Sequence, residues 1–439
     1  MKPRHSIVAM CSIFMIGAST LSAQTTPVPA DTTAPLRVFI DCPYSCDLDF
    51  IRTEMPWVDY MNDRADAQVH VLVTQEGTGG GGSQYTLNFI GLREFVALND
   101  TLKYTSTSED SQDATRRGLT RMIQLGLMPF IARTPHGRRM KVSMESPTAG
   151  AATAVPAKRD PWNYWNFRLG FNGQGNGESR SDSKHYSGNI SASRTTEEWK
   201  SSIGINSSQN LQSVTYPTPS GRDTTERFFS RSSSIDGSLT KSLGQHFSAG
   251  MTASLSTSTY GNIELSTSIK PAVEYDFFPY KESNRRMLTA QYSIGMRSFD
   301  YQDTTIYLKT KETVPQHSLS LGYSTQEPWG SANLYASYSQ YLHDTDFFNT
   351  GIGGSTDVRL FKGFSFNIFG DYSMVRDQLS LQKGKASQAD VLLRQREQAT
   401  NFRYFIGMGL SYRFGSIFNN VVNPRMGGGG GGGRTIIFF

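Results

Sequence analysis

Two histidines lie next to side chains that could take part in hydrolysis. His185 lies two residues before Ser187, and His343 precedes Asp344 and Asp346. A serine hydrolase needs a base beside its nucleophile, and a histidine with neighbouring acids can activate water. In a chain this rich in serine and aspartate such neighbours arise by chance, and no catalytic motif surrounds either histidine. We therefore expect no catalytic residues and no enzyme, and a hydrolase is the alternative.

Two cysteines, Cys42 and Cys46, could form a disulfide or hold a metal. The chain starts with a basic segment, an apolar stretch over 7–21 and small residues after it, which predicts a signal peptide at 1–23 and export. An oxidising compartment permits a disulfide, and the three residues between these cysteines do not match a thioredoxin-like motif. No second ligand pair accompanies them, so we expect a structural disulfide, no metal and no cofactor.

A glycine cluster at 77–82 could cradle a phosphate. A phosphate loop joins a strand to a helix and usually ends in Gly-Lys-Ser/Thr, but here a strand pattern follows and the cluster has no lysine. The cluster is therefore expected to be a hairpin tip in a small α+β domain. The predicted elements are a strand at 36–41, a helix within 47–64 that Pro56 should break or kink, strands at 69–74, 85–90 and 101–107, and a helix from 111–113 to 131.

Helical periodicity disappears after residue 160 and is replaced by strict alternation. One face of the segment 402–414 is apolar: Phe402, Tyr404, Ile406, Met408, Leu410, Tyr412 and Phe414. The intervening positions are mostly glycine, serine and arginine. Twelve such segments begin near residues 163, 184, 198, 228, 246, 263, 286, 316, 331, 350, 364 and 402. Most approach the 9–11 residues with which a tilted strand crosses a bilayer, roughly twice the usual strand length in soluble sheets.

The connections between these segments differ in length at the two ends. The predicted turns at 195–198, 243–246, 279–284, 327–330 and 362–363 are short. The alternate connections are longer, at 213–226, 301–315, 343–349 and 382–401. Short periplasmic turns and long external loops are typical of outer-membrane barrels, whereas a soluble sandwich gives no reason to sort its loops this way.

Composition agrees with a barrel and excludes other classes. The 439 residues have a mean hydropathy of −0.42, which excludes a bundle of membrane-spanning helices, and a net charge of only +5, which argues against a nucleic-acid binder. We predict a mainly β protein, a transmembrane antiparallel barrel of about twelve strands after a small α+β domain. Its parts are a signal peptide (1–23), a disordered leader (24–35), a periplasmic α+β domain (36–140), a linker (141–161), an outer-membrane barrel (162–416) and a Gly-rich tail (417–439).

Alternation also predicts which charged residues face the lumen. The candidates are Lys270, Glu274, Arg297, Asp371, Arg403 and Arg413. Mixed charges among small side chains can line a narrow aqueous path. The same charges can instead pair inside a purely structural barrel, and twelve strands lie between filled eight-stranded barrels and open sixteen-stranded porins. Both alternatives remain open.

Residues 160–415 resemble porin-like outer-membrane β-barrel proteins of bacteria. Gly409, Tyr412 and Phe414 are similar to the terminal signal by which such barrels engage their assembly machinery, although residues follow this strand here. Tyr275–Tyr280, Arg285-Arg286 and Gln291–Gly295 resemble the salt-induced outer-membrane protein family. The order of elements in the N-terminal domain is similar to small α/β modules of periplasmic assembly proteins.

Together these features predict location and function. We expect the outer membrane of a diderm bacterium, with outer-membrane lipid and the barrel assembly machinery as partners and with no nucleic acid. The expected function is a narrow pore or envelope scaffold whose periplasmic domain docks a periplasmic or envelope protein. The alternatives are a hydrolase at the barrel rim and a surface adhesin or binding module that uses the long loops.

Overall fold

The computed structural model describes residues 35–42, 46–139, 160–217, 221–384 and 397–423. The expected signal peptide, nearly all of the leader, most of the linker and the glycine tail beyond residue 423 lie outside these ranges. No helix within the described ranges is both long enough and apolar enough to cross a membrane.

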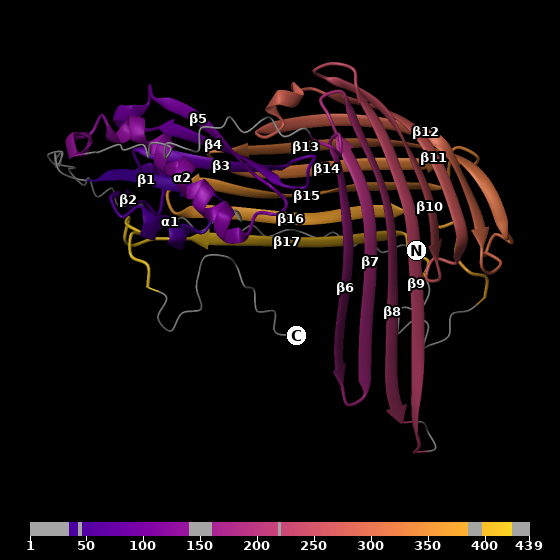
Figure 1. Ribbon diagram of the computed structural model, residues 1–439. Helices are drawn as coiled ribbons and strands as arrows, with labels where there is room; N and C mark the ends of the chain where they lie inside the picture. Colours follow the sequence, from indigo (N-terminus) through magenta and orange to yellow (C-terminus); the bar gives the residue numbers. More distant parts are fainter. Residues whose placement is uncertain (1–34, 43–45, 140–159, 218–220, 385–396, 424–439) are drawn as a thin grey trace, which may run out of the picture. The chain divides into compact units, whose positions relative to one another are not determined.

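The N-terminal module, here residues 35–139, contains a five-stranded sheet. The strands are β1 (Leu36–Asp41), β2 (Val58–Tyr60), β3 (Val69–Gly77), β4 (Ser83–Gly91) and β5 (Asn99–Ser106), in the order β2-β1-β3-β4-β5. The helices are α1 (Leu48–Glu54) and α2 (Gln112–Ile131), with short 3-10 turns η1 (Arg64–Asp66), η2 (Arg93–Phe95) and η3 (Pro135–Arg139). β1 is parallel to β2 and β3, and β3, β4 and β5 form an antiparallel meander (Figure 1).

The module has its own apolar core between α2 and the sheet. Leu119, Ile123 and Leu127 repeat at helical spacing along α2 and are fully buried in one cluster with Leu87 and Phe89 of β4. The apolar face that strand alternation gives the sheet thus packs against the apolar face that 3.6-residue periodicity gives the helix. Val38 of β1 and Val69, Val71 and Val73 of β3 are buried in the same core, which holds these two paired strands in place.

Most predicted elements of the module are confirmed, including the glycine hairpin between β3 and β4 and the break at Pro56 within the helical segment 47–64. α1 ends at Glu54, before this proline, and the part of the segment beyond it forms β2 at 58–60 rather than more helix. Pro56 lacks a backbone N–H and disfavours helical geometry at the preceding residue, Met55. The shortened helix frees the next residues to pair with β1.

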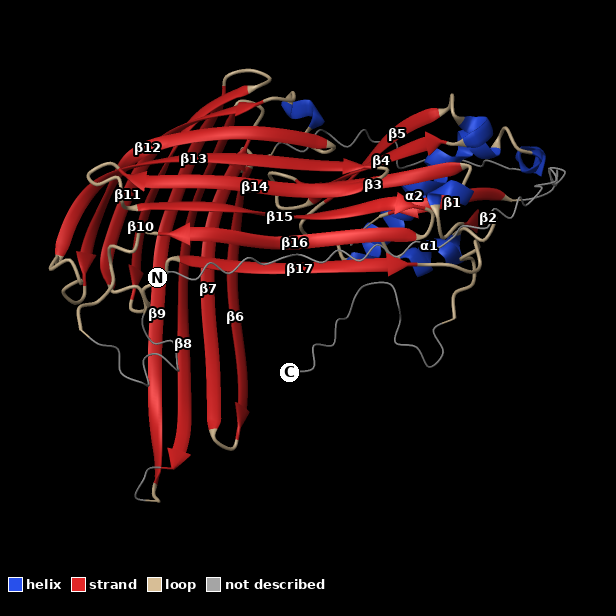
Figure 2. Cartoon of the chain, turned by 180° about the vertical axis from the view of Figure 1, so that it is seen from behind, coloured by secondary structure: helices blue, strands red, loops and turns tan. Residues whose placement is uncertain are grey.

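The second half of the chain forms one antiparallel sheet of twelve strands in sequence order. They are β6 (Trp165–Glu178), β7 (Ser181–Thr195), β8 (Trp199–Pro217), β9 (Asp223–Ser242), β10 (Phe247–Ser258), β11 (Ile263–Asp276), β12 (Arg286–Tyr301), β13 (Lys311–Glu327), β14 (Gly330–Tyr341), β15 (Phe348–Phe361), β16 (Phe364–Val375) and β17 (Phe402–Tyr412). All twelve predicted strands are confirmed, and Figure 2 shows their length relative to the small N-terminal strands.

The two ends of this sheet carry different connections. The turn end holds the links at 196–198, 243–246, 277–285, 328–329 and 362–363, and the loop end holds those at 179–180, 218–222, 259–262, 302–310, 342–347 and 376–401. The predicted loop at 213–226 is mostly strand, because β8 and β9 continue to Pro217 and from Asp223. These strand ends contain mainly serine, threonine and other polar residues, so a pattern of alternating hydrophobicity does not reveal them.

The sheet is not closed by the pairings of the described residues. β6 and β17 are its two outer strands, and no pairing joins them. The predicted strand number, direction and order are therefore confirmed, and closure of the barrel belongs to the proposal below.

Candidate functional site

The pairing register gives the twelve-stranded sheet one polar and one apolar face. A row of facing residues on neighbouring strands runs Asn166, Ser193, Ser202, Ser238, Thr252 and Lys270. The adjacent row runs Phe167, Ala192, Ile203, Gly237, Ala253, Ile269 and Met296. The second half repeats this contrast, with Gln291, Ser320, Ser337, Gly351, Ser373 and Arg403 in one row and Tyr323, Leu334, Gly354, Gly370 and Ile406 in another. We call these the polar face and the apolar face.

The apolar face is uncovered. The exposed fractions of the side chains are 49% for Ile269 and 70% for both Met408 and Leu410. An apolar surface that continues across twelve strands exceeds the few hundred Å² that soluble monomers expose. This face needs an apolar environment such as lipid.

Aromatic side chains border the apolar face at both ends. On β16 and β17 the rings of Phe364 and Tyr412 lie 6.4 Å apart at the turn end, and those of Tyr372 and Phe402 lie 6.4 Å apart at the loop end. The strand length between these pairs projects to about 20–25 Å at the usual tilt of membrane strands. That height matches the apolar band of outer-membrane barrels, about 25 Å, with aromatic rings at the two lipid interfaces.

The structure places five of the six predicted lumen residues on the polar face. Lys270 and Glu274 lie on β11, Arg297 on β12, Asp371 on β16 and Arg403 on β17. The sixth, Arg413, follows the last residue of β17, and its backbone N–H donates a hydrogen bond to the Gly363 carbonyl at 2.7 Å. β17 ends at Tyr412, one residue before Arg413, so the strand alternation that predicted a lumen position does not reach Arg413. This residue lies at the turn end.

The other predicted site residues have simple surroundings. Cys42 and Cys46 form a disulfide with a Cα–Cα distance of 5.7 Å, next to the core of the module. Gly409 lies on the polar face, whereas Tyr412 and Phe414 stack at the turn end with their ring centroids 5.6 Å apart. Their role as an assembly signal stays a prediction.

The two histidines considered for catalysis make other contacts. His185 Nδ1 lies 2.6 Å from Asn210 Oδ1 on the neighbouring strand, and the His343 ring stacks on Phe347 at 5.8 Å. Among the described residues no group of three His, Cys, Asp or Glu side chains is arranged to hold a metal ion. Among the described contacts, His185 pairs with an amide oxygen and His343 with aromatic rings, rather than with a serine or an acid.

A site that the sequence did not reveal lies where the N-terminal module meets the turn end. Arg359, near the end of β15, donates from Nη2 to Asp41 Oδ1 at 2.8 Å and from Nη1 to the other carboxylate oxygen. Lys362 pairs with Asp66 at 2.8 Å, and the Gly363 N–H donates to Asp63 at 2.7 Å. Between 296 and 318 positions separate the partners of these contacts along the chain, and no local sequence pattern links them.

A buried histidine lies behind this ion pair. His70 is fully buried on β3, with Nε2 at 3.5 Å from Asp41 Oδ2 and its ring 5.3 Å from that of Phe39. Burial acts to raise the pKa of Asp41, but Arg359 and His70 outweigh it and hold this pKa at about 2. Burial lowers the pKa of His70 despite the opposing effect of Asp41. The arrangement therefore favours an ionised Asp41, a charged Arg359 and a neutral His70.

The chain just after β17 adds to the edge of the N-terminal sheet. Met61 and Phe418 form an antiparallel bridge. On either side, Asn62 N–H donates to the Ile417 carbonyl at 2.9 Å and Asn419 N–H donates to the Tyr60 carbonyl at 2.7 Å. This pairing satisfies backbone groups at the β2 edge, which would otherwise be open to another strand.

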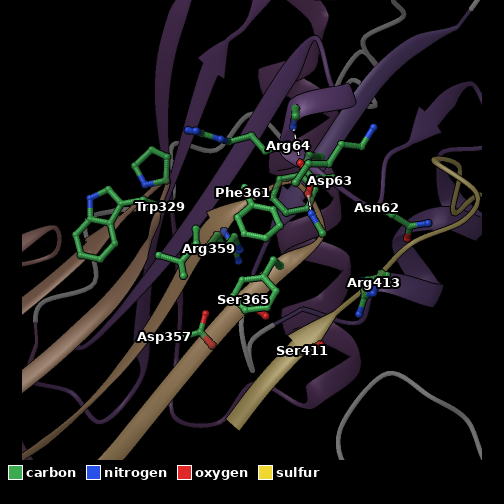
Figure 3. A pocket seen from close by; sticks show the side chains of 17 residues that line it. Asn62, Asp63, Arg64, Trp329, Asp357, Arg359, Phe361, Ser365, Ser411 and Arg413 are labelled. Atoms are coloured by element: carbon green, nitrogen blue, oxygen red, sulfur yellow. Dashed lines mark hydrogen bonds between the residues drawn. The ribbon is translucent and has the colours of Figure 1, made fainter. Parts of the chain in front are cut away.

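Two polar cavities remain at this contact. One, of about 390 Å³, is lined by residues that include Phe39, Asp63, Arg64, Arg359, Phe361 and Arg413. Figure 3 shows Asp63 and Arg64 beside Phe361 and Arg359. The other, of about 550 Å³, is lined by residues that include Asp41, Glu76, Arg285, Asn333, Asp357 and Arg359. The module thus covers part of the turn end and leaves polar space beside Arg359.

No family model matches the sequence, and no curated protein matches it. Among solved structures, a NanC porin in a rhombohedral crystal form is similar to 56% of this chain and 98% of that chain. The identity is 9% and the TM-score is 0.28.

The Asp41 site predicts a loss of stability in acid. His70 has a pKa below its ordinary value of 6.5 in the folded protein, so its contribution to stability is complete above pH 6.5 and falls as the pH drops below it. Asp41 adds a second loss as the pH falls from 3.8 towards 2. We expect the urea midpoint of the detergent-solubilised protein to decrease between pH 7.5 and 5. The His70→Gln variant should lack this decrease, and an unchanged slope in the variant would contradict the assignment.

Proposed function

We propose that this chain is an outer-membrane β-barrel protein that forms a narrow polar passage, with its N-terminal module at the periplasmic mouth. One observation carries the proposal: along the middle of the twelve strands the register places most exposed apolar residues on one face and most polar residues on the other, with Phe369 and Phe405 as exceptions on the polar face. A soluble sheet with this pattern would leave its apolar face in water. In a membrane barrel the same face contacts lipid and the polar face lines the interior.

A membrane location requires the sheet to close. Each unpaired backbone amide in hydrocarbon costs several kcal/mol, so a spanning sheet has no free edges. Apolar residues have odd numbers on β6 and even numbers on β17, as in Leu169 and Leu410. An antiparallel β6–β17 pair that keeps one face apolar must therefore join odd to even positions.

Cysteine cross-linking tests this closure. Leu169→Cys is combined in turn with Met408→Cys, Leu410→Cys and Tyr412→Cys, three registers that all satisfy the odd–even rule. One pair should form a disulfide in most of the membrane-inserted protein, seen as a mobility change without reductant. Leu169→Cys with Ile352→Cys on β15 is the control and should not react, because β15 is not next to β6 in a closed barrel. If no β17 position reacts in folded protein, closure through these strands is wrong.

The orientation follows from the two ends. Outer-membrane barrels have short periplasmic turns, and three of the five links at the turn end, at 196–198, 328–329 and 362–363, have two or three residues, whereas at the loop end only the link at 179–180 is that short. The N-terminal module contacts this end through Arg359, Lys362 and Gly363. The proposed role of the module is therefore to restrict the periplasmic mouth of its own barrel. Docking of a separate envelope protein on the remaining surface of the module stays a prediction.

Conductance measurements distinguish a barrel with an open passage from a barrel that serves only as a scaffold. Purified protein reconstituted in a planar bilayer should give discrete conductance steps, which increase when the module is loosened, as set out in the Discussion. A folded, inserted protein that conducts in neither form would support a scaffold instead.

A further inference from the structure

Two basic side chains lie close together on the polar face without an acidic partner. Arg297 on β12 faces Ser268 on β11, and Lys270 is the next residue on that face of β11. Diagonal neighbours of this kind have Cβ atoms within about 7–8 Å. None of the ion pairs among the described residues includes either side chain. The result is a local positive charge on a surface otherwise rich in hydroxyl groups.

The guanidinium of Arg297 is held in a fixed place. Its Nε donates to Ser266 Oγ at 3.1 Å, and its central carbon lies 4.7 Å from the centre of the Phe299 ring. These contacts use one N–H and one flat side of the group, and the side chain of Tyr341 takes a further hydrogen bond from it. Its other N–H donors can reach a bound anion, and a planar guanidinium suits the geometry of a carboxylate or phosphate.

Acidic residues on the surrounding strands have other partners. Glu312 on β13 accepts a hydrogen bond from Tyr301 at 2.7 Å, and Glu274 on β11 accepts one from Tyr280 at 3.0 Å. Asp300 pairs with a lysine at the loop end at 2.6 Å. Val314 of β13 faces Arg297 and Glu312 is the next residue on that face, so Glu312 is a diagonal neighbour of Arg297 on one side as Lys270 is on the other. None of these carboxylates forms an ion pair with Lys270 or Arg297, and the two cations outnumber the one adjacent acid.

An inward-folded segment closes over this part of the polar face. Leu379, in the connection between β16 and β17, is buried with Phe299, Tyr301, Val314 and Tyr341. Ile306 N–H donates to the Leu381 carbonyl at 2.8 Å and Asn262 Nδ2 donates to the Ser380 carbonyl at 3.0 Å, which anchor the segment to two neighbouring connections. The apolar cluster excludes water beside Arg297 and thereby strengthens its interaction with a passing charge.

We propose that Lys270 and Arg297 form an anion-binding site within the passage, below the segment 379–381, and that the solute is a small organic anion with a carboxylate or another oxyanion group. This inference rests on the proposed function, because the polar face must line an aqueous path. The two cations attract the anion, and the hydroxyl groups of neighbouring serines offer further hydrogen bonds. The inward-folded segment 379–381 narrows the passage and thereby limits the size of the solute.

Ion selectivity in planar bilayers tests the site. Under a KCl gradient we expect the wild-type reversal potential to show preference for chloride by about threefold or more, because fixed charge in a narrow path raises the local counter-ion concentration. The Lys270→Gln/Arg297→Gln double variant should lose this preference, with a permeability ratio near one. Arg297→Lys, which keeps the charge, should retain most of it. Lys311→Gln at the loop end is a charge-matched control and should leave the ratio within the error of the wild type.

A second measurement uses an organic anion. Citrate added to one side should reduce chloride conductance in the wild type and not in the double variant. Heat-modifiable electrophoretic mobility shows whether each variant is folded. Conductance with no anion preference, or a preference that persists in the folded double variant, would overturn the anion site while leaving the passage intact. If neither the wild type nor the Arg359→Ala variant conducts, the proposed function fails and this inference with it.

Discussion

Leu321→Arg is expected to prevent stable insertion of the folded protein into membranes, whereas Ser320→Arg should be tolerated. Leu321 lies in the middle of β13 on the apolar face, where its side chain is exposed, and Ser320 is on the polar face. Arginine on the lipid side of a barrel costs about 2–4 kcal/mol near the bilayer midplane. An arginine on the other side enters an aqueous interior and remains hydrated.

The two variants form a matched pair because they add the same charge at adjacent positions of one strand. The measurement is the free energy of unfolding in lipid vesicles, obtained with urea, together with heat-modifiable mobility. Leu321→Arg should lower the free energy by at least about 2 kcal/mol relative to Ser320→Arg. Equal effects, or the reverse order, would mean that the apolar face does not contact lipid.

Arg359→Ala should loosen the N-terminal module and raise the conductance of the barrel severalfold. The change removes both hydrogen bonds to Asp41 and leaves that carboxylate buried without its main partner. Breaking a buried pair costs about 3–5 kcal/mol. Because Arg359 is about one-third exposed, solvent screening reduces the expected loss to about 1–3 kcal/mol.

Lys362→Ala is the control for this experiment. Its pair with Asp66 lies at the same contact, but the lysine side chain is more than half exposed, so its loss should cost less than about 1 kcal/mol. Protease sensitivity of the module and single-channel conductance are measured for both variants. An Arg359→Ala protein with wild-type protease resistance and wild-type conductance would show that the module does not restrict the passage.

A double variant separates charge from packing. Asp41→Leu/Arg359→Met replaces both members of the pair by apolar groups and leaves no unpaired buried charge. It should restore much of the protease resistance lost in Arg359→Ala. Failure to do so would indicate that neighbouring contacts, rather than the ion pair, hold the module in place.

The twelve strands could be predicted because residues of different polarity alternate along them with a period of two. Residues such as Ile406 and Gly407 alternate over lengths that few soluble strands reach, and the structure starts every strand within five residues of the predicted position. The largest errors fall at β9 and β13, whose first residues carry mainly polar side chains. Where the residues on both faces are polar, the sequence shows no alternation of hydrophobicity. The length of a strand beyond the apolar band is then decided by its pairing with the neighbouring strand.

The contact around Asp41 could not be predicted for a different reason. Asp41 ends a short strand and Arg359 lies two residues before the end of a long one, so in the sequence each resembles an ordinary exposed charge near a turn. Their pairing depends on the relative placement of two sheets that no local propensity encodes. In the sequence His70 is a single histidine within the strand segment 69–74, and only the three-dimensional structure shows that it lies behind the carboxylate of Asp41.

The strand-like pairing of Phe418 with Met61 links the order of synthesis to the order of assembly. Residues 58–62 emerge from the ribosome long before residues 416–420, yet each supplies backbone partners to the other. The β2 edge therefore stays unprotected until residues 416–420 have been made. A truncated chain without these residues would expose this sheet edge to pairing with a strand of another molecule.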